Sequence, residues 1–310
     1  MLKRTSPSLV SIRAFEAAAR LSSFAKAGDE LGMSGAAISY QIKRLEAFIG
    51  RPMFIRRAQG VSLTEHGSAI APAVIDAFAT LRQTFAGAAR KESSVIEVTT
   101  LPSIGVAWLA PRLSAFEATH PHLSVSLDLS VPAVDFSDDR FDVSVRTGAG
   151  RWPGVTAVKL MPNLFAPLCA PGRREQVRAA LAHPDRPFPF RLLGRISWWQ
   201  RWFEANGHAN VDLEGRFGTR FEREHLDVAA ASTGNAVAIA SPLIFADELA
   251  SGRVVLATPV VAADDRGIWV ACSSGRSAHP KIRVFRDWIK QLADVPLPSD
   301  WDVRTVARQG

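Results

Sequence analysis

The chain has 310 residues, of which 47% are hydrophobic, and carries a formal net charge of +7. This length exceeds that of one small domain and predicts two or three compact units. No run approaches the ~18 apolar residues of a membrane span, and no apolar segment with a cleavage site follows the basic start. We therefore expect a cytoplasmic protein that does not enter a membrane.

The charge is distributed unevenly along the chain. Residues 1–92 hold 13 Lys and Arg against 7 Asp and Glu, whereas residues 93–310 hold 24 against 23. A basic segment joined to a nearly neutral remainder fits phosphate binding at one end and another role at the other. Solvated basic surfaces give similar totals, so the charge supports nucleic-acid binding without establishing it.

The first 50 residues carry a helix-turn-helix pattern. Ser6-Pro7 predicts the start of a first helix, with Leu9 among the residues facing inward. A second helix is expected over Phe24–Leu31, where apolar residues recur on one face, and Gly32 ends it.

A third helix is expected to begin at Ser34, as its N-cap, and to end at Gly50. Its apolar positions fall at i, i+4, i+7 and i+11, so they share one inward face: Ile38, Ile42, Leu45 and Ile49. The remaining face has the small, hydrogen-bonding and cationic residues that a major groove accepts. The candidate DNA contacts on this helix are Ser34, Gly35, Ala36, Ser39, Tyr40, Lys43 and Arg44.

A short basic hairpin follows the third helix. Pro52–Arg57 predicts a strand, Ala58–Gly60 a turn and Val61–Leu63 the return strand. In such a wing, Arg56 and Arg57 would contact phosphate. A structural helical hairpin with a solvated charged face remains the alternative, but the added wing favours DNA.

A long helix is expected from Thr64 to Arg90, with a kink at Pro72. Apolar residues recur along it in steps of 4, 3, 4 and 3, which predicts pairing with a second copy of the chain. The alternative is a helix packed on its own domain. The residues of this seam are Val74, Phe78, Leu81, Phe85 and Ala88.

Beyond residue 94, predicted strands alternate with helices, which indicates an open α/β sheet. Such sheets bind ligands where strands end and helices begin. Three segments meet this description and supply candidate effector contacts, although Ser103 has the alternative role of a plain N-cap. The candidates are Thr100 and Ser103, then Arg146, Thr147 and Gly148, then Arg223, Glu224 and His225.

The motif resembles the winged helix-turn-helix of LysR-type transcriptional regulators. Ser23–Leu31 and Ser34–Glu46 are similar to the family's second and third helices, and Met53–Arg56 with Leu63–Gly67 to its wing and linker. The subgroup that contains glycine-cleavage activators and β-lactamase-gene regulators is the most similar. That similarity is carried by Trp108–Leu113, Val143–Arg146 and Trp199–Phe203.

This resemblance implies an α/β chain in three parts: a winged helix-turn-helix domain over 1–66, a dimerisation helix over 67–92, and an effector domain over 93–310. The effector domain would resemble a periplasmic solute-binding protein. Its subdomain I would comprise 94–165 and 268–302, and its subdomain II 166–267, joined by strands crossing near 163–170 and 264–272.

The resemblance also implies a mechanism. A homodimer or homotetramer would bind double-stranded promoter DNA on the nucleoid, take up a small anionic effector, and alter DNA bending to activate or repress nearby genes. RNA polymerase is a further partner in this scheme, and no catalytic residue, metal or cofactor is expected. Three departures from the family pattern, Gly35, Tyr40 and Gln59, prevent transfer of an operator sequence.

Three alternatives remain open from the sequence. Cys169 and Cys272 would act as a redox switch in a redox-responsive regulator. The second half alone would suit a solute-binding protein. His225, Asp227 and Ser232 lie close in sequence as an enzyme would need, but no nucleophile elbow, metal motif or phosphate loop organises them.

Overall fold

The structure, a computed structural model, describes residues 7–57, 60–89, 94–132, 136 and 140–306. The chain forms two compact units, the first made of residues 1–90 and 152–154 and the second of residues 91–151 and 155–310. Among the described residues no helix has both the length and the apolar character to cross a membrane.

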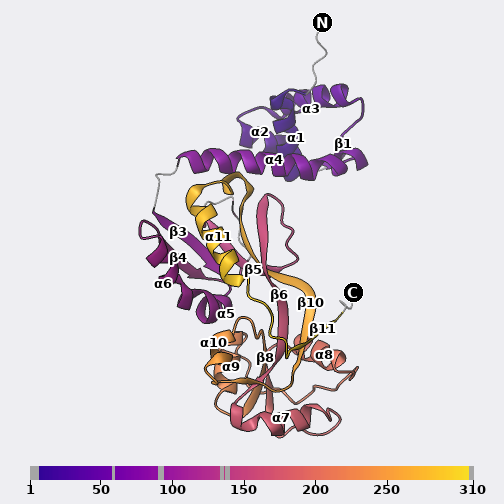
Figure 1. The fold of residues 1–310 in the computed structure, drawn as a ribbon. Coiled ribbons are helices and arrows are strands. Elements are labelled where there is room, and N and C mark those ends of the chain that lie inside the picture. Colours follow the sequence, from indigo (N-terminus) through magenta and orange to yellow (C-terminus); the bar gives the residue numbers. More distant parts are fainter. Residues whose placement is uncertain (1–6, 58–59, 90–93, 133–135, 137–139, 307–310) are drawn as a thin grey trace. The chain divides into compact units, whose positions relative to one another are not determined.

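The first unit is a three-helix core with a two-stranded wing and a long fourth helix (Figure 1). Serine side chains cap the first three helices by accepting a backbone N–H, and these serines are Ser8, Ser23 and Ser34. The predicted cap at Ser34 is therefore confirmed. The elements are α1 Leu9–Leu21, α2 Phe24–Leu31, α3 Gly35–Ile49, β1 Phe54–Arg57, β2 Gly60–Leu63 and α4 Glu65–Ala89.

The first helix differs from the prediction because Ser8, not Ser6-Pro7, provides its start. Leu9 is 63% exposed, so its predicted inward position is also wrong. The core of the unit is built by Phe15, by Ile38, Ile42 and Leu45 on α3, and by Met53. Ile49, at the end of α3, is 37% exposed, so its predicted inward position is wrong.

The predicted seam on α4 divides into an inner and an outer part. Val74 packs against the core of the first unit. Phe78 is buried, whereas Leu81 is 43% exposed. The side chains of Phe85 and Ala88 lie outside the described residues. The N-terminal half of the seam therefore packs on its own domain, as the alternative anticipated, and Leu81 is left facing outward.

The second unit is the α/β fold expected from the sequence. Its strands follow the order β4-β3-β5-β10-β6-β8-β7, with β11 beside β10 and β9 beside β6. The strands are β3 Val95–Thr100, β4 Ser124–Leu129, β5 Val143–Gly148, β6 Val155–Cys169, β7 Arg191–Leu193, β8 Ala236–Ala240, β9 Val255–Leu256, β10 Val260–Ser273 and β11 Asp302–Thr305. The longer helices are α6 Ala110–Thr119, α7 Arg174–Leu181, α8 Ile196–Ala205, α9 Glu224–Ala231 and α11 Pro280–Ala293, and the shorter ones are α5 Pro102–Ile104 and α10 Ala246–Ala250.

The long strands β6 and β10 run through two lobes of the second unit (Figure 1). We call β3, β4 and β5 with α5 and α6 the first lobe, and β7 and β8 with α7, α8 and α9 the second lobe. The two long strands are antiparallel partners, and their register shifts between Ala263 and Gly267. Continuous strands thus connect the lobes.

The helical segment that begins with α5 and ends with α6 is not a regular α-helix throughout. Between α5 and α6 the residues Gly105–Leu109 form a π-helical turn. A Cβ on Gly105 would lie 2.2 Å from Leu129 Cδ2, so a larger residue here would require the leucine side chain at the end of β4 to shift. Such turns are often found at functional sites, and this one follows the candidate residue Ser103.

Candidate effector cavity and DNA-binding surface

The outer face of α3 and the wing share one polar surface in the first unit. Arg56 Nη2 donates a hydrogen bond to Ser39 Oγ at 2.8 Å, so the wing is fastened to the recognition helix. The guanidinium of Arg56 also lies 5.9 Å from the ring centre of Phe24. This contact orients a cation beside the helix that would enter the groove.

Tyr40 extends from the same face and is 60% exposed. The guanidinium of Arg44 lies 5.9 Å from its ring centre, which limits the positions that the phenol adopts. The other candidate contacts are partly or fully exposed: Ser34, Gly35, Ala36, Lys43 and Arg57. Gln59 lies outside the described residues.

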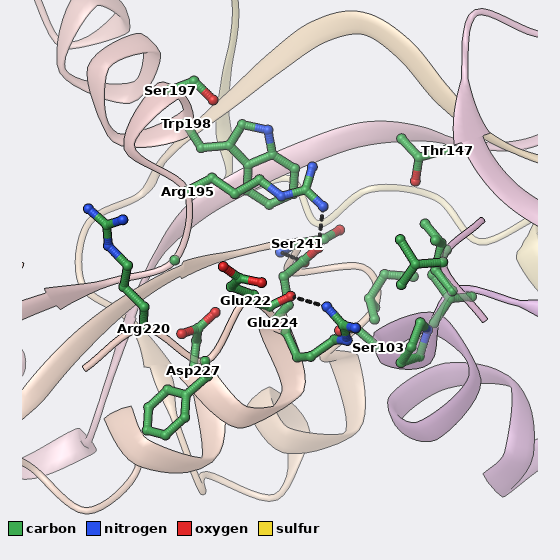
Figure 2. Close-up of a pocket in the computed structure, with 18 of the residues that line it drawn as sticks. Ser103, Thr147, Arg195, Ser197, Trp198, Arg220, Glu222, Glu224, Asp227 and Ser241 are labelled. Carbon is green, nitrogen blue, oxygen red and sulfur yellow. Dashed lines mark hydrogen bonds and ion pairs between the residues drawn. The ribbon is translucent and has the colours of Figure 1, made fainter. Parts of the chain in front are cut away.

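A cavity of about 480 Å³ lies between the two lobes of the second unit (Figure 2). Its first-lobe wall is mostly apolar, with Leu101, Ile104, Val131 and Ile268 and the hydroxyls of Ser103 and Thr147. Among the residues that the structure describes, the charged ones that line the cavity all lie on its second-lobe wall: Arg195, Arg220, Glu222, Arg223, Glu224 and Asp227. A ligand in this cavity would therefore meet apolar surface on one side and both signs of charge on the other.

Ser103 and His225 meet across the cavity. Ser103 Oγ accepts the backbone N–H of His225 at 3.2 Å, and it lies 3.2 Å from His225 Nδ1. Burial, assisted by the charge of Arg223, lowers the pKa of His225. A neutral imidazole lets Nδ1 accept the serine proton, so one hydroxyl holds α9 through two bonds. The N-cap alternative for Ser103 fails because Leu101 occupies the cap position.

Two carboxylates stand on α9 at the cavity. Burial raises the pKa of Asp227 to about 6, while Arg195 and the Gly194 amide act in the opposite direction. Burial also raises the pKa of Glu224, whose Oε1 lies 4.0 Å from Arg195 Nη2. Glycine at 194 has φ +92 and a Cβ there would lie 2.8 Å from Ile239 O, so the chain needs glycine to bring this amide to Asp227.

The structure does not bring all predicted effector residues to the cavity. Ser103, Thr147, Arg223 and Glu224 line it, and His225 reaches it through Ser103. The other three, Thr100, Arg146 and Gly148, do not line it. The placement of Arg146 and Thr147 follows from strand geometry, because adjacent residues on β5 point to opposite faces.

Arg146 instead supports the first lobe from behind the cavity wall. Its Nη2 donates to Thr99 Oγ1 at 2.9 Å and lies 3.4 Å from Ser130 Oγ, and burial lowers the pKa of its guanidinium. Thr100 Oγ1 donates to Val145 O at 3.2 Å and is fully buried. These residues hold neighbouring strands together.

Three residues that line the cavity were not predicted as effector contacts from the sequence: Arg195, Asp227 and Ser241. Arg195 follows β7 and precedes α8, so it satisfies the strand-end rule that selected Ser103. The rule could not be applied from the sequence because β7 has only three residues, too few to show the alternation of a strand. Of the tryptophans of α8, Trp198 lines the cavity, whereas Trp199 and Trp202 are buried in the second-lobe core.

The structure offers little support for a redox switch or for a metal-dependent enzyme site. Both cysteines are free and buried, and burial raises the pKa of Cys169 to about 11 and that of Cys272 in the same direction. Such thiols are mostly protonated at neutral pH and react slowly. In the part of the chain that the structure describes, no three His, Cys, Asp or Glu residues gather as metal ligands would.

Together, the fold and the two surfaces define a regulator with a winged DNA-binding head and a ligand-binding α/β unit. Residues 9–68 match the family model of bacterial regulatory helix-turn-helix proteins of the lysR family, and residues 89–294 match that of the LysR substrate binding domain. The second match spans more than half of the chain. The chain therefore belongs to the LysR family of transcriptional regulators, as its sequence motifs indicated.

Named relatives agree with this assignment. The chain is 32% identical over 296 residues to the glycine cleavage system transcriptional activator of Escherichia coli strain K12, covering 93% of this chain and 94% of the relative. It is 33% identical over 297 residues to the transcriptional activator AmpR of Pseudomonas aeruginosa, covering 93% and 96%. The redox-responsive and solute-binding alternatives gain no support from these relatives.

Solved structures show the same fold. The effector domain of AmpR of Pseudomonas aeruginosa is 27% identical, with a TM-score of 0.53, and covers 64% of this chain and 94% of its own. Full-length LysG of Corynebacterium glutamicum, solved with bound effector Arg, is 16% identical with a TM-score of 0.52 and covers 93% of this chain and 98% of its own. The second likeness concerns the fold alone.

Proposed function

We propose that the protein controls transcription from a promoter near its own gene by binding an interrupted dyad operator through α3 and the wing. The observation that carries this proposal is the bond from Arg56 Nη2 to Ser39 Oγ at 2.8 Å, which makes helix and wing one continuous surface. In the proposal, Ser34, Gly35, Ala36, Ser39 and Tyr40 face base edges, and Lys43, Arg44, Arg56 and Arg57 contact phosphate.

The effector site is proposed at the cavity between the lobes. Arg223 and the Thr147 hydroxyl would bind an anionic group, and Ser103 would donate to it by exchanging its bond to His225 Nδ1, with Arg195 and Arg220 as further cations on the wall. Glu224 lines the cavity beside Arg195, and His225 acts through Ser103. Thr100, Arg146 and Gly148 are assigned to the support of the first lobe, not to direct contact.

The proposed working unit is a homodimer or homotetramer acting on the nucleoid in the cytoplasm. Exposed Leu81 on α4 would lie in the contact between two copies. Effector binding would shift the assembly between two arrangements only by its differential affinity for them, and the arrangement would set the DNA bend and the contact with RNA polymerase. The protein would act by binding, without catalysis.

The domain boundaries in this proposal are those expected from the sequence. Residues 1–66 form the DNA-binding domain, 67–92 the linker and 93–310 the effector domain. Within the effector domain, subdomain I is 94–165 with 268–302, and subdomain II is 166–267.

Binding to the DNA upstream of its own gene tests the proposal. Full-length wild type, Lys43→Ala, Arg56→Ala and Arg174→Ala are compared by fluorescence anisotropy over a series of salt concentrations. Arg174 is the matched control, because it is an exposed cation on α7 of the other unit. Lys43→Ala and Arg56→Ala should each weaken binding about three- to tenfold and reduce the salt slope by about 1. Unchanged affinity and slope in both variants would contradict it.

A further inference from the structure

Two carboxylates of α9 share one arginine at the second-lobe wall of the cavity. Glu224 and Asp227 stand three residues apart on α9, which places their side chains next to each other. Arg195 is the cation that acts on the pKa of both. Its guanidinium also stands 4.7 Å from the ring centre of Trp198, which holds it in place. One guanidinium carries one charge, so one carboxylate charge remains uncompensated when both groups are ionised.

A buried hydroxyl beside these carboxylates lacks a hydrogen-bond partner. Ser241 is 2% exposed and lines the cavity, and its Oγ makes no hydrogen bond in the described structure. Its backbone N–H reaches Glu224 Oε2 at 3.4 Å, so the hydroxyl and the carboxylate belong to the same corner (Figure 2). Buried polar side chains are normally paired, and an unpaired one on a cavity wall is available to a ligand.

Hydrogen-bond acceptors are therefore concentrated in this corner of the cavity. Two carboxylates and one hydroxyl line it, and the donors that act on the carboxylates are Arg195 and the backbone N–H groups of Gly194 and Ser241. Of the other charged residues on this wall, Arg220, Glu222 and Arg223, it is Arg223 whose charge acts on His225, beside Ser103. The cavity is thus polarised, with an acceptor-rich corner at Glu224, Asp227 and Ser241 and a cationic side near Ser103.

We propose that the corner formed by Glu224, Asp227 and Ser241 binds a protonated amine, so that the effector is a zwitterion with an ammonium group as well as an anionic group. An ammonium has three N–H donors and no acceptor, which matches the three acceptor groups of the corner. The proposal rests on the proposed function of the cavity and narrows its ligand class. It adds that an apolar part of the ligand would face Leu101, Ile104 and Ile268.

The raised pKa values of the two acids fit this assignment. Burial holds the pKa of Asp227 near 6, so the ionised carboxylate is costly in the empty cavity and would be stabilised by an adjacent ammonium. The same cause raises the pKa of Glu224. An ammonium beside these partly desolvated acids interacts with them more strongly than it would in bulk water, because the local dielectric constant is lower.

Matched probe compounds test the proposal on the full-length protein. L-leucine is compared with 4-methylpentanoate, which lacks its amine, and with 3-methylbutylamine, which lacks its carboxylate. L-phenylalanine, 3-phenylpropanoate and 2-phenylethylamine repeat the comparison with a larger apolar part. Affinities are measured by calorimetry at pH 7.5 for wild type, Asp227→Asn, Glu224→Gln, Ser241→Ala and Arg223→Gln. Glu175→Gln is the control, because this carboxylate is exposed on α7.

At least one amino acid should bind wild type about tenfold or more tightly than its amine-free partner. That preference should disappear in Asp227→Asn and Glu224→Gln, shrink in Ser241→Ala, and survive in Glu175→Gln. Equal or tighter binding of the amine-free acids, or a preference that persists in both acid variants, overturns the proposal. In that case, weaker binding of the amine-free ligands to Arg223→Gln would still support the anionic effector site, although the amine-binding corner would be disproved. Absence of binding by every amine-bearing compound at about 10 mM overturns the amine corner and leaves the effector site without support.

Discussion

Ser103 on α5 and His225 on α9 are joined across the cavity although 122 residues separate them. The serine oxygen accepts the His225 backbone N–H at 3.2 Å and contacts Nδ1 at the same distance. Since α5 belongs to the first lobe and α9 to the second, this pair links the two walls between which an effector would lie.

Ser103→Ala removes both bonds. We expect the second unit to lose about 1 kcal/mol of unfolding free energy, because the group is partly buried and water replaces part of the lost interaction. Urea unfolding followed by tryptophan fluorescence measures this loss, since seven of the eight tryptophans lie in the second unit. Faster amide hydrogen exchange in α9 should accompany the loss.

Ser197→Ala is the matched control, because Ser197 is an exposed serine that also lines the cavity. It should change neither the unfolding free energy nor the exchange of α9. If both serine variants behave alike, the pair does not hold the lobes together.

Asp227→Asn should stabilise the second unit above about pH 6. The pKa of Asp227 is about 6 in the folded chain against an ordinary value of 3.8. The folded state therefore holds this proton more tightly than the unfolded state. The resulting stability is fully present below pH 3.8 and is lost as the pH rises through 6. The asparagine variant lacks this loss, and Glu224 still pairs with Arg195 in it.

Unfolding free energies at pH 4, 5, 6, 7 and 8 check this expectation. The difference between variant and wild type should grow in favour of the variant by about 1–2 kcal/mol across that range, after allowance for solvent screening. A difference that stays constant with pH would mean that Asp227 does not carry the raised pKa.

Local signals were readable from the sequence, whereas contacts between distant segments were not. The Ser34 cap depends on residues within one turn, so composition and spacing revealed it. The partner of Ser103 depends on how α9 folds back over the sheet, which no local pattern encodes. Arg146 and Thr147 are adjacent on β5 and so point to opposite faces of the strand, which is why only Thr147 lines the cavity.

Tyr40 and Lys43 should affect DNA binding in different ways. Tyr40 is 60% exposed and is held beside Arg44, so Tyr40→Phe removes a hydroxyl while the ring stays in place. If the hydroxyl reads a base edge, the variant should lose affinity for some operator sequences by about 1 kcal/mol or more and keep the wild-type salt slope. Lys43→Ala should weaken all sequences alike and lower the slope.

Binding to a set of single-base operator variants at two salt concentrations separates these effects. If Tyr40→Phe binds every operator variant more weakly by the same factor, the tyrosine hydroxyl contacts the phosphate backbone and not a base edge. Arg174→Ala again serves as the control for loss of one positive charge.

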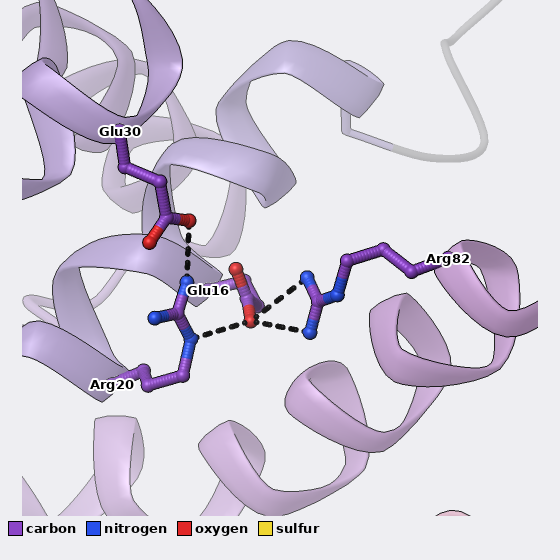
Figure 3. A network of polar contacts seen from close by, with 4 residues as sticks. All are labelled: Glu16, Arg20, Glu30 and Arg82. Atoms are coloured by element: carbon purple, nitrogen blue, oxygen red, sulfur yellow. Dashed lines mark hydrogen bonds and ion pairs between the residues drawn. The ribbon is translucent and has the colours of Figure 1, made fainter. Parts of the chain in front are cut away.

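Glu16 should be the most sensitive polar residue of the first unit (Figure 3). Its side chain on α1 is 1% exposed and accepts hydrogen bonds from Arg20 Nε at 3.1 Å and from Arg82 on α4 at 3.3 Å. Glu16→Ala would leave Arg20 with Glu30 alone and Arg82 without this partner. We expect it to cost about 2–3 kcal/mol, because a buried pair broken on one side leaves its partners poorly satisfied.

Arg82→Ala is the informative comparison, because Arg82 is 52% exposed and Arg20 continues to neutralise Glu16. It should cost less than about 1 kcal/mol in stability, yet it removes an ion pair that ties the outer part of α4 to α1. Hydrogen exchange should therefore accelerate in α4 of Arg82→Ala while α1 and α3 keep wild-type protection. Circular dichroism melts of both variants supply the stability ranking, and an Arg82 variant as unstable as Glu16→Ala would show that the α4 contact, not burial of the Glu16 charge, governs the unit.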